Sequence, residues 1–96
     1  MKKYEIMFIV RPDLENEANK AVADTMKTVL TDKGATILEA KEMGQRELAY
    51  EIKKYKTGYY YLYVIESKDA EAISEFDRLS LISEDILRHL IIKVEK

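Results

Sequence analysis

Side chains that commonly perform catalysis or bind metals are scarce in this chain. It has no cysteine and one histidine, His89, so thiolate nucleophiles and sites built from several histidines are excluded. Its three glycines, Gly34, Gly44 and Gly58, are too widely separated to form a phosphate-binding loop. We therefore expect no enzyme activity, no metal, no cofactor and no small-molecule substrate.

A small enzyme such as an acylphosphatase remains an alternative. Such an enzyme needs an anion-binding loop after its first strand and a nearby catalytic asparagine. Residues 11–14 contain no glycine, and Asn16 and Asn19 fall within a helical pattern. A phosphatase assay separates this alternative from a protein without catalysis.

Basic side chains gather around one polar turn. Lys53, Lys54 and Lys56 lie within residues 53–58, and Arg46 precedes them on the same extended segment. Lysines on a protruding turn can reach phosphates without burial of the whole domain. The competing interpretation is a solvated turn whose lysines discourage pairing with other strands.

The first third of the chain predicts a strand followed by a helix. Residues 4–10 are aromatic, aliphatic and β-branched, which is typical of a strand. Apolar residues then recur at three- and four-residue steps, which predicts a helix over residues 14–33. Asp13 is the expected N-cap, and Gly34 is expected to end the helix.

The middle third predicts a β-hairpin. Residues 36–52 are extended, and the alternation of apolar residues changes near Gly44, which indicates a bulge or bend. A polar turn over residues 53–58 leads into a second strand over residues 59–66.

The last third predicts a second helix and a final strand. Ser67 or Asp69 is the expected cap of the helix. Its apolar stripe recurs at helical spacing and comprises Ala70, Ile73, Phe76, Leu79, Leu81 and Ile82. Residues 83–85 form a loop, and residues 86–94 form a strand.

The resulting order is β-α-β-β-α-β. With right-handed crossovers, this order gives a four-stranded antiparallel sheet with both helices on one face. The expected class is therefore α+β, with the ferredoxin-like split βαβ fold. The 96 residues support one domain, spanning residues 1–96.

Charge is divided unequally between the predicted elements. The net charge is -2, yet the strand-rich segments 1–11, 41–65 and 86–96 hold eleven basic and five acidic residues, a balance of +6. The two remaining segments hold five basic and thirteen acidic residues, a balance of -8. We expect acidic helices on one face and basic strands on the other, an arrangement that allows an acidic protein to bind phosphate.

The face of the sheet away from the helices is expected to be apolar. If the strands alternate regularly, this open face collects seven apolar side chains: Met7, Ile9, Tyr60, Leu62, Val64, Leu90 and Ile92. A contiguous exposed apolar patch usually marks a partner-binding surface.

No targeting or membrane segment is expected. The apolar run at residues 6–10 is too short for a signal peptide and is preceded by Glu5. No segment approaches the roughly 18 apolar residues that cross a bilayer. The working expectation is a cytoplasmic protein without a membrane partner.

One segment carries a family resemblance. Residues 44–54, GQRELAYEIKK, resemble the signature of the sixth protein of the bacterial small ribosomal subunit. Residues 3–12, KYEIMFIVRP, are similar to the opening strand of that family. The FDRL and ISEDILRH segments, at residues 76–79 and 82–89, are similar to its second helix and last strand.

The resemblance implies a ferredoxin-like structural protein of the cytoplasmic ribosome. Members bind the central domain of small-subunit ribosomal RNA as a heterodimer with the eighteenth small-subunit protein. The open face would then take this protein partner. The implied RNA-binding residues are Lys2, Lys3, Arg46, Lys53, Lys54 and Arg88, and the basic turn adds Lys56 as a candidate.

A ligand-sensing or homodimeric interaction module on the same fold is the other alternative. Its open face or sheet edges would pair with a second copy. Light scattering of the purified protein separates the two, because a stable homodimer without RNA favours the module.

Overall fold

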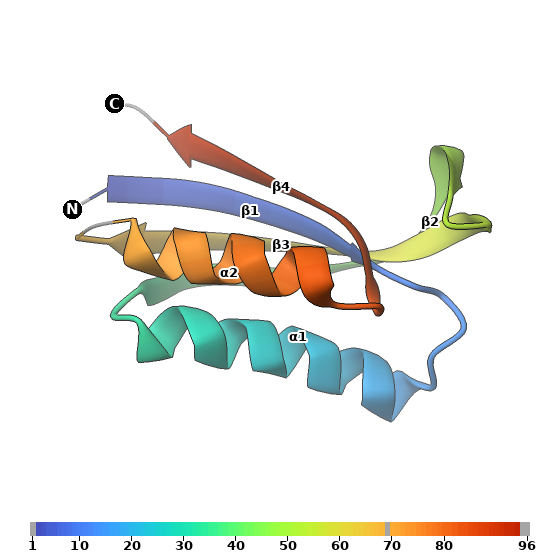
Figure 1. Ribbon diagram of the computed structural model, residues 1–96, viewed down its shortest axis with the longest axis horizontal. Helices are drawn as coiled ribbons and strands as arrows, with labels where there is room; N and C mark the ends of the chain where they lie inside the picture. Colours follow the sequence, from blue (N-terminus) through green and yellow to red (C-terminus); the bar gives the residue numbers. More distant parts are fainter. Residues whose placement is uncertain (1, 69, 95–96) are drawn as a thin grey trace.

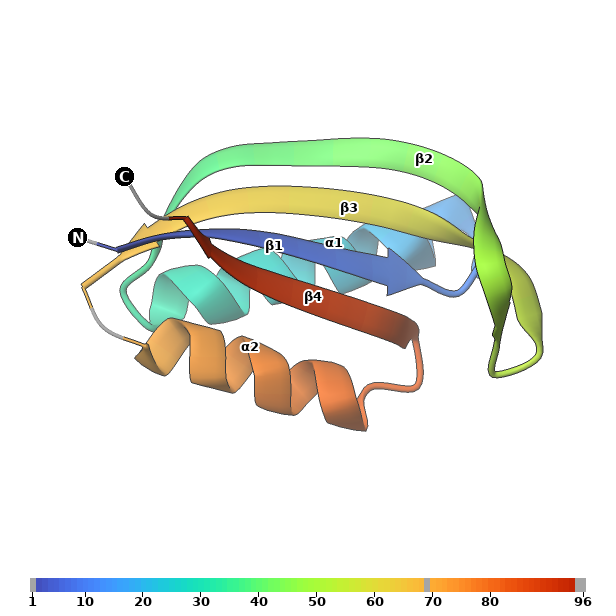
Figure 2. The same ribbon diagram turned by 90° about the horizontal axis from the view of Figure 1, so that it is seen from above.

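The computed structural model describes residues 2–68 and 70–94. Its elements follow the predicted order: β1 (Lys2–Val10), α1 (Asn16–Asp32), β2 (Thr36–Ile52), β3 (Tyr55–Ser67), α2 (Glu71–Ile82) and β4 (Ile86–Val94). The strands form one antiparallel sheet in the order β2-β3-β1-β4. Both helices cover the same face, which confirms the ferredoxin-like fold (Figures 1 and 2).

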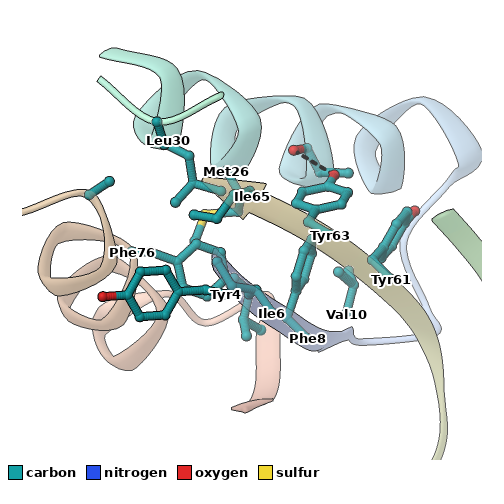
Figure 3. Packing of buried hydrophobic residues seen from close by; sticks show 14 residues of the cluster. Tyr4, Ile6, Phe8, Val10, Met26, Leu30, Tyr61, Tyr63, Ile65 and Phe76 are labelled. Carbon is teal, nitrogen blue, oxygen red and sulfur yellow. Dashed lines mark hydrogen bonds between the residues drawn. The ribbon is translucent and has the colours of Figure 1, made fainter. Parts of the chain in front are cut away.

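The core lies between the sheet and the two helices. Alternate residues of β1 point toward the helices, and Ile6, Phe8 and Val10 have no solvent exposure. The Phe8 ring stacks on Tyr61 at 5.1 Å and meets the edge of Phe76 from α2 at 5.8 Å between ring centres (Figure 3). The Tyr63 hydroxyl donates a hydrogen bond of 3.1 Å to the Ala23 carbonyl, which ties β3 to α1.

The C-terminal end of α1 confirms the role of Gly34. This residue has φ +89°, in the left-handed region that glycine tolerates. Its N–H bonds the Thr31 carbonyl, and the Ala35 N–H bonds the Leu30 carbonyl, each at 3.0 Å. This pair of bonds is a Schellman motif, which satisfies carbonyls that the helix leaves open.

The predicted start of α1 is wrong. The N-cap position is Glu15, without a side-chain cap bond. The side chain of Asp13 is instead engaged by Arg11 and Tyr55.

The predicted limits of α2 also need correction. Ser67 does not cap this helix, because it is the last residue of β3, and Asp69 lies outside the described residues. Leu81 and Ile82 do not close the apolar stripe, since they are 71% and 66% exposed. The buried face of the helix holds Ala72, Phe76 and Ser80, and Leu81 and Ile82 lie off this face.

The β2–β3 hairpin is longer than predicted and strongly bent. Only Lys53 and Lys54 form its turn, with φ +49° and +72°, and Ile52 pairs with Tyr55. The predicted bulge at Gly44, which has φ +85°, is confirmed by a register shift. Toward its tip the hairpin leaves the plane of the sheet and bends to the side opposite the helices (Figures 1 and 2).

Candidate nucleic-acid and partner interface

Five of the predicted basic residues lie at the hairpin end of the molecule. Arg46 pairs with Gly58 where the hairpin leaves the sheet, and Lys53, Lys54 and Lys56 follow at its tip. Arg88 belongs to β4, the opposite edge strand, but its guanidinium carbon lies 5.8 Å from the centre of the Tyr50 ring. The bend of the hairpin therefore brings cations from both edges of the sheet to one end.

These five cations are exposed and unpaired in the part of the chain that the structure describes. Within residues 2–68 and 70–94, none of them forms an ion pair. Glu47 and Glu51 are also on the hairpin, yet neither forms an ion pair with a described cation. A cation without an internal partner is free to exchange its counter-ion for a phosphate.

Lys2 and Lys3 lie at the other end of the sheet. They begin β1, whose far end, Val10, lies near the hairpin. At about 3.3 Å per residue, the two ends of β1 are roughly 26 Å apart. The structure thus divides the predicted RNA-binding residues into a hairpin group and a distant pair.

The seven predicted partner-binding residues share the open face. Met7 pairs with Leu62 on one side and Leu90 on the other, which places these side chains in one row across the sheet. Leu90 and Ile92 are each 47% exposed. The accessible apolar surface is therefore concentrated near β4.

Two of the seven are buried, contrary to expectation. Ile9 is 7% exposed and Val64 is 9% exposed. The Ile9 side chain lies close against Gly58 of the neighbouring strand β3, where an added β-carbon would overlap the Ile9 Cγ2 atom. Neither residue offers the free surface that simple alternation along the strands predicts.

A hollow of about 250 Å³ separates the bent hairpin from the open face. The hairpin contributes Leu48, Tyr50 and Ile52, and the sheet contributes Met7 and Leu90 among others. The sequence did not indicate that the hairpin residues belong to this surface. Leu48, Tyr50 and Ile52 alternate with other residues, which indicates that their side chains share one face of the hairpin. The alternation does not indicate which strands that face would meet.

Arg11 forms a polar network that the sequence analysis also missed. Its Nε donates to Asp85 Oδ1 at 2.8 Å, and its Nη1 lies 3.3 Å from Asp13 Oδ2. The Tyr55 hydroxyl donates to the same Asp13 oxygen at 3.1 Å. Hydrogen bonding with Tyr55 and Asp85 raises the pKa of Arg11, so it keeps its charge throughout the working pH range.

His89 contacts α2, through Asp77 and Phe76. Its Nε2 lies 2.6 Å from Asp77 Oδ1, and its ring meets the edge of Phe76 on the helix side of the sheet. The described residues contain no group of three or more acidic, histidine or cysteine side chains placed to hold a metal.

The helices are less acidic than expected. The described α1 and α2 carry six acidic and three basic residues, a balance of -3. Part of the acidic excess lies in loops, where Asp13 and Asp85 contact Arg11. Unpaired positive charge at the hairpin is therefore the clearer electrostatic feature of the molecule.

A family model described as Ribosomal protein S6 matches residues 3–93. The chain belongs to the ribosomal protein S6 family. This confirms the resemblance found in residues 44–54 and at both ends of the chain. It is a family of structural proteins of the ribosome, not of enzymes.

Two solved structures support the S6 fold assignment. The crystal structure of 30S ribosomal protein S6 from Thermotoga maritima matches with a TM-score of 0.91 and 26% identity, covering 97% of this chain and 87% of that one. The solution structure of the C-terminal domain of the MgtC protein from Mycobacterium tuberculosis matches with a TM-score of 0.65 and 12% identity, covering 99% and 89%. The second likeness shows the fold alone. Neither helix of the described S6-family chain could span a bilayer.

Proposed function

We propose that this S6-family protein is a structural constituent of the small ribosomal subunit. It binds the central domain of small-subunit ribosomal RNA together with the eighteenth small-subunit protein, as a heterodimer. The observation that carries this proposal is the family match over residues 3–93, and the charge and shape of the molecule agree with it.

The RNA is assigned to the hairpin end. Arg46, Lys53, Lys54, Lys56 and Arg88 are exposed and unpaired among the described residues. Contacts of lysine and arginine with phosphates supply affinity, and the shape of the folded RNA supplies specificity. Lys2 and Lys3 reach the same RNA only if it extends along the whole sheet.

The protein partner is assigned to the open face. Leu90 and Ile92 are half-exposed, and Met7, Tyr60 and Leu62 lie beside them on the same face. Covering these side chains removes apolar area from water at a gain of about 25 cal/mol per Å². A chain of net charge -2 offers few basic contacts by itself, so binding of the partner should precede or accompany RNA binding.

Co-sedimentation with small ribosomal subunits at moderate salt tests the assignment. We expect the wild-type protein to pellet with subunits that have been depleted of their own copy, and to do so better when the partner is present. A protein that stays in the supernatant under both conditions would contradict the proposal.

A further inference from the structure

The tip half of the hairpin is tied to two loops by a chain of polar contacts. Tyr55 on the hairpin donates to Asp13 in the β1–α1 loop at 3.1 Å. Asp13 contacts Arg11 at 3.3 Å, and Arg11 binds Asp85 in the α2–β4 loop at 2.8 Å. These four residues, which we call the Arg11 latch, join segments that lie far apart in sequence.

We propose that the Arg11 latch positions the hairpin, holding it bent over the open face so that its unpaired cations are presented in one arrangement. The consequence for RNA rests on the proposed function. The hold on the hairpin is a property of the free protein and can be measured without RNA.

The hairpin needs support from outside itself. Its strand pairing is interrupted between Glu47 and Ile52, and pairing resumes only at Ile52 and Tyr55, next to the turn. A two-stranded ribbon is marginally stable on its own in water. The contact between Tyr50 and Arg88 is exposed, and a cation over an exposed ring is a weak tie.

The two ends of the Arg11 latch differ in how many hydrogen bonds hold them. Arg11 is fixed to the α2–β4 loop twice, since its backbone N–H also bonds the Asp85 carbonyl at 2.9 Å. On the hairpin, by contrast, one exposed hydroxyl, that of Tyr55, makes the contacts with Asp13 and Arg11. The hairpin is therefore released by losing the Tyr55 hydroxyl, whereas the Arg11 end stays in place.

A released hairpin loses affinity without losing charge. Its cations are still present, so the number of phosphates neutralised, and with it the salt dependence, stays the same. Binding must then order a mobile segment, which lowers affinity. This combination distinguishes a positioning role from a direct phosphate contact.

Tyr55→Phe is the first test, with Tyr59→Phe as its matched control. Tyr59 lies on the same strand, and its hydroxyl has no hydrogen bond among the described residues. In free Tyr55→Phe, hydrogen exchange of the amides in residues 46–57 should accelerate about 2- to 10-fold, the size of one hydrogen bond. The affinity for small-subunit RNA should fall by a similar factor with an unchanged salt slope, and Tyr59→Phe should change neither.

A second pair of variants separates the latch from general damage to the hairpin. Asp13→Ala should also accelerate exchange, because it removes the acceptor of the Tyr55 hydroxyl. The double variant should add little to Tyr55→Phe, because loss of the hydroxyl already releases the hairpin from both Asp13 and Arg11. Asp13→Asn keeps a carbonyl oxygen for Tyr55 and should restore much of the protection.

The outcomes are distinguishable. Unchanged exchange in both Tyr55→Phe and Asp13→Ala overturns the latch. Faster exchange with wild-type RNA affinity overturns its positioning role and leaves the proposed function standing. A wild-type protein that binds no RNA overturns the proposed function and the positioning role together, whereas exchange still decides whether the hairpin is latched.

Discussion

At the scale of single residues, Lys53 and Lys54 are expected to act through side-chain charges that no described carboxylate neutralises. Neither forms an ion pair within the described part of the chain, and both are exposed at the hairpin turn. A contact between an exposed lysine and an RNA phosphate releases a bound counter-ion, so its contribution weakens as salt rises. Their role can therefore be read from the salt dependence of binding.

Replacing both residues in Lys53→Ala/Lys54→Ala should weaken RNA binding and reduce the slope of log affinity against log salt by about one to two units. The measurement is RNA affinity across a salt series. The control, Lys20→Ala/Lys33→Ala, removes two exposed lysines from the helix side and should leave the slope unchanged. Equal slopes in the wild type and the Lys53/Lys54 variant would exclude these lysines as contacts.

Tyr61 links stability to alkaline pH. Burial, with a smaller contribution from the Glu42 carboxylate, raises the pKa of Tyr61 from 10.0 to about 12. A raised pKa means that the folded state favours the neutral phenol. Its stabilising effect is fully present below pH 10 and is lost as pH rises through 12.

The urea midpoint should fall between pH 10 and 12 in the wild type. Tyr61→Phe should be less stable near neutral pH by about 1 kcal/mol, because it loses the bond to Asn19, but its decline above pH 10 should be shallower. A decline as steep as that of the wild type would show that Tyr61 does not carry the effect.

At the scale of elements, the end of α1 depends on a backbone conformation. Gly34→Ala should lower the free energy of unfolding by about 1–2 kcal/mol, because a β-carbon strains the left-handed conformation. Gly34→Asn should cost less, since asparagine tolerates this region better. Urea unfolding measures both. Equal stability of Gly34→Ala and the wild type would contradict the conformational argument, because among the described residues beyond its chain neighbours no heavy atom lies within 4 Å of the added carbon.

The helices and strands were largely predictable because their signals are local and periodic. Alternation along β1 assigned Met7 and Ile9 to the open face, and the residues between and beside them, Ile6, Phe8 and Val10, are buried under the helices. The bulge at Gly44 was visible as a change of parity. Errors occurred where contacts distant in sequence decide the outcome. Asp13 could have been a helix cap, but Arg11 and Tyr55 compete for its carboxylate.

The sequence predicted the charge of the candidate site but not its shape, because contacts between residues distant in sequence determine the shape. Composition located the basic hairpin, because Lys53, Lys54 and Lys56 are close in sequence. Its bend over the open face depends on contacts with β4 and two loops, which no local pattern encodes. The burial of Ile9 and the exposure of Leu81 therefore emerged only from the structure.

At the scale of the whole molecule, the two proposed surfaces are adjacent. The helices cover one face of the sheet (Figure 2). The apolar row lies on the other face, and the hairpin group of cations, unpaired among the described residues, lies at its hairpin end. One bound RNA and one bound protein would then also contact each other. Loss of the protein partner should consequently weaken RNA binding even when every cation is present.

Leu62→Asp should abolish formation of the heterodimer with little effect on folding, because a partly exposed side chain in the apolar row becomes a charge that the interface must bury. Leu81→Asp, at a 71% exposed position on α2, is the matched control and should bind normally. Binding to the purified partner and circular dichroism provide the two measurements. Wild-type partner affinity in Leu62→Asp would place the interface elsewhere.

The hairpin turn has a thermodynamic implication. Lys53 and Lys54 hold positive φ angles, in a turn geometry that asparagine and glycine adopt at lower cost. An Asn-Gly turn would therefore make the hairpin more stable while removing both charges. If Lys53 and Lys54 contact RNA as proposed, folding and RNA recognition favour different residues at this turn, and a redesign for thermal resistance would weaken RNA binding there.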